Sequence, residues 1–114
     1  MRIINTYPEE LSNKKVYDLT LSPKIQKMSE NEGTILEVAA YCFYEDEDSD
    51  GKSRKLLSVL TPEGESFATN SSTFMEDFQR MIDVFGPAGV TAIEIISGTS
   101  KAGRRFITCA YAGE

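Results

Sequence analysis

Two kinds of side chain in this sequence have types and positions suited to binding: aromatic rings, and cations that flank them. The rings lie in segments that read as strands: Tyr41, Phe43, Tyr44, Phe67, Phe106 and Tyr111. The cations lie at the ends of those segments and in one turn: Lys52, Arg54, Lys55, Lys101, Arg104 and Arg105. Flat rings can stack on nucleobases, and lysine and arginine can contact phosphates without reading sequence. We expect the two sets to line one groove.

Each of these residue types also has an ordinary structural role. Strand aromatics more often pack in a core, and cations at strand ends commonly protect a sheet edge. Alternation along the strand makes Tyr41 and Phe43 point outward if Cys42 points inward. Two outward rings need a cover, which is a helix, the N-terminal segment, a partner or a base. Tyr44 falls on the inward side, so its exposure depends on its place at the strand end.

The composition removes the familiar routes to an enzyme or a metal site. The chain has no histidine, and its two cysteines, Cys42 and Cys109, lie far apart. The commonest general base and metal ligand is therefore missing, and neither a phosphate-binding Walker loop nor a GxGxxG motif is present. We expect no catalysis, no metal and no cofactor. We expect the cysteines to be reduced core thiols of a cytoplasmic protein, with a disulfide possible only if their strands meet.

Negative charge is concentrated in one run, EDEDSD at residues 45–50. The net charge is −6 with 18 acids and 12 bases, so the chain outside this run is close to neutral. No strong basic stripe appears, which argues against tight electrostatic binding of a nucleic acid. The run is not a calcium loop, because Leu57 stands where the closing glutamate would be.

One helix and five strands must position these residues. An apolar residue recurs every three or four positions in one segment, at Phe74, Phe78, Met81, Ile82 and Phe85, which predicts a helix. Thr73 with Glu76 fits a capping box at its start, Ser71 or Ser72 can cap it instead, and Gly86 ends it. Strands are predicted at residues 34–44, 54–61, 65–69, 90–97 and 104–111.

The order of three strands, a helix and two strands is that of an OB-fold barrel. We expect a mainly β fold with a five-stranded OB-like barrel at residues 33–114. The helix lies between its third and fourth strands.

Residues 1–32 are expected to form a short, partly helical arm that packs on the barrel within one domain overall. Ser12 can cap a first helix, and Ser22 with Pro23 can start a second over residues 24–28. An extended first segment is the alternative, because Val16 and Leu19 also suit a strand. We find no signal peptide and no apolar run long enough to span a membrane.

Three segments carry a resemblance to a known family: GTILEVAAYCFY at residues 33–44, GESFA at 64–68 and SGTSKAG at 97–103. They resemble the small single-stranded-DNA-binding proteins of phages that replicate by protein priming, with related copies on mobile elements of Gram-positive bacteria. The similarity covers roughly residues 33–111. It implies an OB-fold and sequence-independent binding of single-stranded DNA. It also implies that Tyr44 and Phe67 stand where the family has rings suited to stacking.

We therefore predict a non-catalytic protein that coats single-stranded DNA during replication of a phage or mobile element, with replication proteins as possible further partners. The alternative is a protein–protein interaction module that contacts a homo- or hetero-oligomeric partner through Tyr41 and Phe43. The net charge of −6 favours that alternative.

Overall fold

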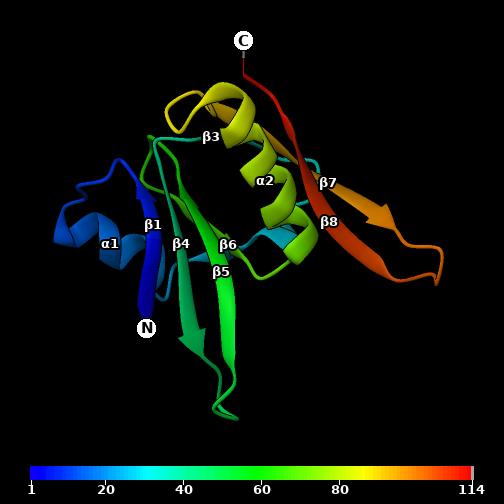
Figure 1. Ribbon diagram of the computed structural model, residues 1–114, viewed down its shortest axis with the longest axis horizontal. Coiled ribbons are helices and arrows are strands. Elements are labelled where there is room, and N and C mark those ends of the chain that lie inside the picture. Colours follow the sequence, from blue (N-terminus) through cyan, green and yellow to red (C-terminus); the bar gives the residue numbers. More distant parts are fainter. Residues whose placement is uncertain (114) are drawn as a thin grey trace.

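The computed structural model describes residues 1–113 as two β-sheets, two α-helices and one short 3-10 helix (Figure 1). The larger sheet has the order β1-β4-β5-β6-β2. Its strands are β1 (Arg2–Tyr7), β4 (Ala40–Glu47), β5 (Ser53–Leu60), β6 (Ser66–Thr69) and β2 (Gln26–Lys27). All neighbours are antiparallel except β2 and β6, which are parallel.

The smaller sheet has the order β3-β7-β8 and is antiparallel. Its strands are β3 (Ile35–Glu37), β7 (Ala92–Thr99) and β8 (Arg105–Tyr111). The chain passes between the two sheets at two consecutive residues. The amide of Val38 donates to the Thr91 carbonyl of the smaller sheet, and the amide of Ala39 donates to the Leu60 carbonyl of the larger one. The single strand predicted at residues 34–44 is therefore divided.

The helix predicted from its apolar repeat is confirmed as α2 (Ser72–Phe85). Ser71 caps it, because its side-chain oxygen accepts from the amide of Phe74 at 3.2 Å, so the capping box with Thr73 is wrong. Gly86 ends the helix with a φ of 85°, a conformation that a glycine adopts without strain. The apolar face of α2 is buried as far as Ile82, but Phe85 is exposed.

The N-terminal segment contains more strand than its sequence predicts. The helix capped by Ser12 is confirmed as α1 (Asn13–Thr20), whereas the helix expected over residues 24–28 is wrong. Residues 26 and 27 form β2, which pairs with β6, and the 3-10 helix η1 (Met28–Glu30) follows it with Met28 fully buried. β1 escaped prediction because its residues are mostly exposed, and its pairing with β4 is irregular between Ile3 and Asn5.

The expected closed barrel is absent from residues 1–113, because the two sheets stay separate. The edge of β6 that a closed barrel would join to β8 pairs with β2 instead. The N-terminal segment therefore supplies two strands of the larger sheet. None of the helices in this part of the chain is long and apolar enough to cross a membrane.

The prediction of reduced core cysteines is confirmed, since Cys42 and Cys109 are both buried free thiols. Cys42 lies beneath α1, and the Cys109 sulfur lies 3.7 Å from the Phe74 carbonyl oxygen. Burial raises the pKa of Cys42 to about 11. Burial, and secondarily the charge of Asp77, raises the pKa of Cys109 to about 12.

We predict that neither thiol of the folded protein reacts with iodoacetamide at pH 8, because both are buried and protonated. Mass spectrometry should detect alkylation only after urea is added. Rapid alkylation of the folded protein would contradict the assignment of both thiols to the core.

The same thiols make the free energy of unfolding depend on pH. The pKa of each thiol in the folded protein exceeds the ordinary 9.0, so the unfolded chain releases these protons first. The free energy of unfolding should hold below pH 9 and fall as the pH rises through about 11 and 12.

Candidate nucleic-acid interface

The rings of β4 that were expected to face outward are in the core. Tyr41 is 1% exposed and Phe43 is 4% exposed. The helix α2 covers both, with the Phe78 ring 5.1 Å from that of Tyr41 and 6.0 Å from that of Phe43. The Tyr41 hydroxyl donates to the Pro87 carbonyl at 3.2 Å. Of the covers that the sequence left open for Tyr41 and Phe43, the structure has the helix, and both rings therefore belong to the main core.

The other face of β4 is buried as well. Tyr44 packs in a second cluster with Leu60 and with Leu19 of α1. Its hydroxyl lies 3.3 Å from that of Ser58, which donates to it, and burial raises its pKa. Phe67, on β6, is 4% exposed and belongs to the main core. In this conformation neither Tyr44 nor Phe67 offers a ring face to a base, and a stacking role for them stays a prediction.

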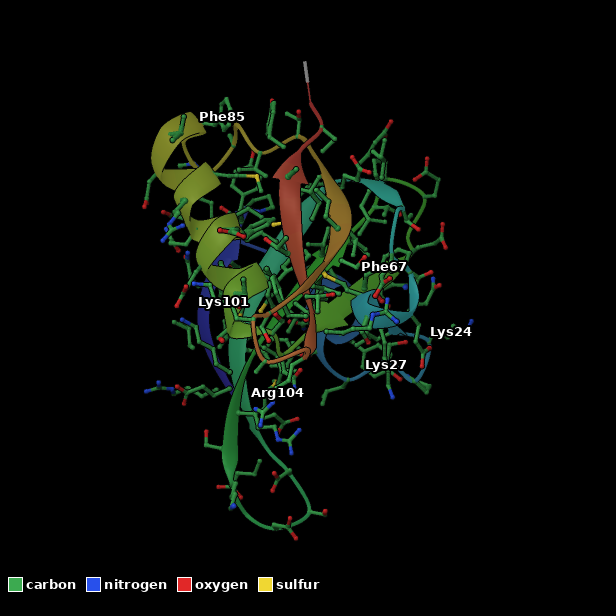
Figure 2. All side chains as sticks on the ribbon, turned by 90° about the vertical axis from the view of Figure 1, so that its right-hand side faces the viewer. Lys24, Lys27, Phe67, Phe85, Lys101 and Arg104 are labelled. Atoms are coloured by element: carbon green, nitrogen blue, oxygen red, sulfur yellow. The ribbon has the colours of Figure 1, made fainter. Side chains whose placement is uncertain are left out.

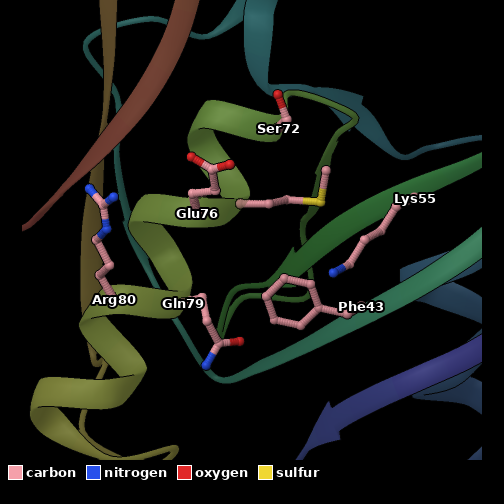
Figure 3. A pocket seen from close by; sticks show the side chains of 7 residues that line it. Phe43, Lys55, Ser72, Glu76, Gln79 and Arg80 are labelled. Atoms are coloured by element: carbon pink, nitrogen blue, oxygen red, sulfur yellow. The ribbon is translucent and has the colours of Figure 1, made fainter.

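Lys55 lies on the side of the larger sheet that faces α2, where its ammonium is 5.5 Å from the centre of the Phe43 ring. Figure 3 shows the two side chains beside Gln79 in a cavity of about 360 Å³ between β4, β5 and α2. The cavity is also lined by Ser72, Met75, Glu76 and Arg80. Because side chains alternate along a strand, Lys55 and its neighbour Arg54 point to opposite faces.

A second cavity of about 430 Å³ is lined by residues of β5 and β8 and by residues in and beside β2 and β6. Strands β5 and β8 belong to the β4–β5 and β7–β8 hairpins, which diverge in Figure 1. We call this cavity the inter-hairpin groove, and its lining residues are Ile25, Gln26, Lys27, Ser29, Arg54, Leu56, Ala68, Thr69, Asn70, Ser71 and Ile107. Strand β2 forms one wall, β5 and the end of β6 form the floor, and β8 contributes the residue opposite. Two of the lining side chains are cations and none is acidic.

Internal carboxylates hold two of the predicted binding cations. Arg54 lies 3.1 Å from Asp48, and Arg105 donates to Glu32 at 2.6 Å. Backbone hydrogen bonds, first from the amide of Lys52 and then from that of Asp50, lower the pKa of Asp48. That carboxylate therefore organises the turn of the β4–β5 hairpin, which gives part of the acidic run a structural role.

The tip of the β7–β8 hairpin carries two cations that are not engaged in this way. Lys101 and Arg104 are exposed and form no ion pair with any carboxylate of residues 1–113. Figure 2 views the molecule from the side toward which this hairpin points, and Lys27 lies on the same side. Two hydrogen bonds close the turn that carries Lys101 and Arg104. The amide of Arg104 donates to the Ser100 hydroxyl, and the amide of Ser100 donates to the Arg104 carbonyl.

The predicted binding residues are therefore not gathered as expected. The structure places Arg54 in the inter-hairpin groove, Lys52 at the turn of one hairpin, and Lys101 with Arg104 at the tip of the other. Lys55 faces α2, and the four rings are buried. In this conformation the rings and cations do not line one groove, because α1 and α2 cover the aromatic strand from both sides.

Sequence reasoning missed Lys27 as a groove residue. It lies in a two-residue strand whose existence depends on pairing with Ala68, more than forty residues away in the chain. No periodic pattern marks so short an element, so no local signal could have found it. In the part of the chain that is described, no three side chains of histidine, cysteine, aspartate or glutamate are grouped to hold a metal ion.

A family model described as "Phage Single-stranded DNA-binding protein", of the phi29 type, matches residues 9–111. The match includes α1, α2 and every strand except β1. No curated protein and no solved structure matches the chain.

We predict that Phe67→Ala lowers the free energy of unfolding by about 3–5 kcal/mol, because it empties a buried aromatic site. Urea denaturation should show this loss. Lys101→Ala is the control and should change stability by less than about 0.5 kcal/mol, because the side chain is exposed. If Phe67→Ala left stability unchanged and weakened DNA binding, the ring would belong to the interface and not to the core.

Proposed function

The chain belongs to the family of phage single-stranded DNA-binding proteins, and from this premise we propose that it coats single-stranded DNA in replication of a phage or mobile element. Binding is sequence-independent and the protein has no catalytic role. The family match over residues 9–111 carries the proposal. We place the protein in the cytoplasm, where two free thiols remain reduced.

We further propose that the fold is an opened relative of the OB barrel. The order β4, β5, β6, α2, β7, β8 supports this proposal. Strand β3 is joined to β4 by two residues and pairs with β7, so the first strand of the barrel is shared between the two sheets. OB barrels bind oligonucleotides between the loop after their first strand and the loop between their last two. In this chain those loops are the turns of the two hairpins that flank the inter-hairpin groove.

The proposed path of the DNA backbone runs across the inter-hairpin groove and over the tip of the β7–β8 hairpin. Lys27 contacts a phosphate in the groove, and Lys101 and Arg104 contact phosphates at the tip. Arg54 contributes in the groove when a phosphate replaces the carboxylate of Asp48. Lys52 lies at the turn of the other hairpin and extends this path. Arg105 contributes when a phosphate replaces the carboxylate of Glu32.

The charge distribution allows this path despite the net charge of −6. Arg2 pairs with Glu45 at 3.1 Å, and Asp48 accepts hydrogen bonds from its own turn, so part of the acidic run is satisfied internally. Few phosphates are neutralised, so the salt dependence should be shallow. Four cations of the path, Lys27, Lys52, Lys101 and Arg104, have no ion pair within residues 1–113. Four contacts to a single strand give a slope of log K against log salt of roughly −3.

We predict that the protein raises the fluorescence anisotropy of a labelled oligo-dT at low salt, and that a mixed-sequence oligonucleotide of equal length binds with similar affinity. Lys101→Ala combined with Arg104→Ala should weaken binding and make the salt slope shallower by roughly 1.4. The matched control is Lys15→Ala combined with Arg80→Ala, which removes the same charge from α1 and α2. The control should change the slope much less.

Two results would count against this proposal. If the wild-type protein does not bind at low salt, single-stranded DNA binding is wrong, and a protein–protein interaction module becomes the better hypothesis. If both double variants change the slope equally, the protein binds DNA through its overall charge and the proposed path is wrong.

A further inference from the structure

The burial of four predicted stacking rings raises the question of which ring can meet a base. Of the partly or fully exposed rings, Tyr17 lies on α1, away from the β7–β8 hairpin (Figure 1), and Tyr7, Phe85 and Tyr111 are already stacked within the protein. Tyr7 lies on Tyr41 with ring centres 5.7 Å apart, and Phe85 lies on Tyr111 with ring centres 4.1 Å apart. Phe106, on β8, is half-buried and lies two residues from Arg104.

We propose that Phe106 is a base-stacking residue and that the outer face of the β7–β8 hairpin is a platform for one nucleobase. This inference rests on the proposed function, and it names the residue that supplies stacking. The groove supplies contacts to the phosphates, whereas this platform contacts the base of an adjoining nucleotide.

Gly98 allows the Phe106 ring to lie across the neighbouring strand. The two residues are directly opposite each other in the β7–β8 pairing. A Cβ atom at position 98 would be only 2.6 Å from Cζ of Phe106 and 2.8 Å from its Cε2. The ring therefore occupies the space that a side chain would fill. A ring laid over a glycine on an open sheet face covers the backbone with one side and presents the other to solvent.

A strip of residues surrounds this ring on the outer face of the smaller sheet, and its apolar members are Ile96 and Ile35. Ile96 is directly opposite Thr108, one pair along from Gly98 and Phe106, and the Thr108 hydroxyl donates to the Asp77 carboxylate of α2. Ile96 is exposed, and so is Ile35 on β3. The alternate residues of both strands point the other way, into the core. A flat base can therefore lie on Phe106 and extend onto aliphatic side chains.

Charge favours a nucleotide at one end of this strip. Arg104 directly precedes β8 and lies two residues before Phe106. The Arg104 side chain forms no ion pair within residues 1–113, and Lys101 lies in the same tip of the β7–β8 hairpin. Glu94 lies at the far end, opposite Ala110. A base on Phe106 therefore has a cation within reach of its phosphate, and an acid bounds the strip.

The chain contains no tryptophan, so Phe106→Trp provides a single reporter at the platform. We expect oligo-dT to quench its fluorescence, because a stacked base contacts the indole directly. Phe85→Trp is the matched control: Phe85 is an exposed ring near the top of Figure 2, well separated from Arg104 in the lower part of the view. Its fluorescence should change little when oligo-dT binds.

Affinity measurements separate the flat ring from apolar bulk. Stacking of one base is worth about 5- to 150-fold in affinity, so Phe106→Leu should weaken oligo-dT binding by roughly 10-fold at an unchanged salt slope. Phe106→Tyr keeps the ring and should bind within about 3-fold of wild type. Gly98→Ala keeps the phenylalanine but displaces its ring, and it should weaken binding as well. Thermal melting of each variant verifies that it is folded.

The outcomes distinguish this inference from the function on which it rests. If the wild-type protein binds no oligonucleotide, both are wrong. If the wild-type protein binds, but Phe106→Leu is folded and binds equally well, only the platform is overturned. Absence of quenching in Phe106→Trp overturns the platform even if Phe106→Leu fails to fold.

Discussion

The burial of strand β4 on both faces is the constraint on which the rest of the molecule depends. One face carries Tyr41 and Phe43 against Phe78 of α2, and the other carries Tyr44 against Leu19 of α1. A strand sandwiched in this way cannot itself be a ligand surface. On the proposed function, contacts with a ligand therefore fall to the inter-hairpin groove, the ends of the hairpins and the outer face of the smaller sheet.

Local patterns in the sequence were sufficient for much of the fold. The apolar repeat of α2, the cap at Ser12 and the alternation of β5, β7 and β8 each depend on residues close together in the chain, and the structure has each of them. The predictions failed where pairing is between distant residues. β1 and β2 exist because β4 and β6 offer them hydrogen bonds, and the division at Val38 results from two sheets competing for consecutive amides.

The candidate site was harder to predict for the same reason. Positions at the ends of predicted strands and in a predicted turn identified the candidate cations, and the structure has two of them, Lys101 and Arg104, exposed at a hairpin tip. Alternation alone could not show that both faces of β4 are covered, because it assigns residues to faces without saying what packs on each. Phe106 was visible as a strand aromatic, but its position over Gly98 depends on the register between two strands.

The short wall of the inter-hairpin groove has a mechanical consequence. Strand β2 is held to the sheet by only two residue pairs, while Met28 next to it is anchored in the core. Few backbone hydrogen bonds must break for such a segment to open locally. Strand β2 can therefore separate from β6 at little free-energy cost while β4 and β5 remain paired. On the proposed path, a yielding wall would let the groove adjust to the changing course of a single-stranded phosphate backbone. Contacts with successive phosphates would then depend on compliance of the protein as well as on its fixed cations.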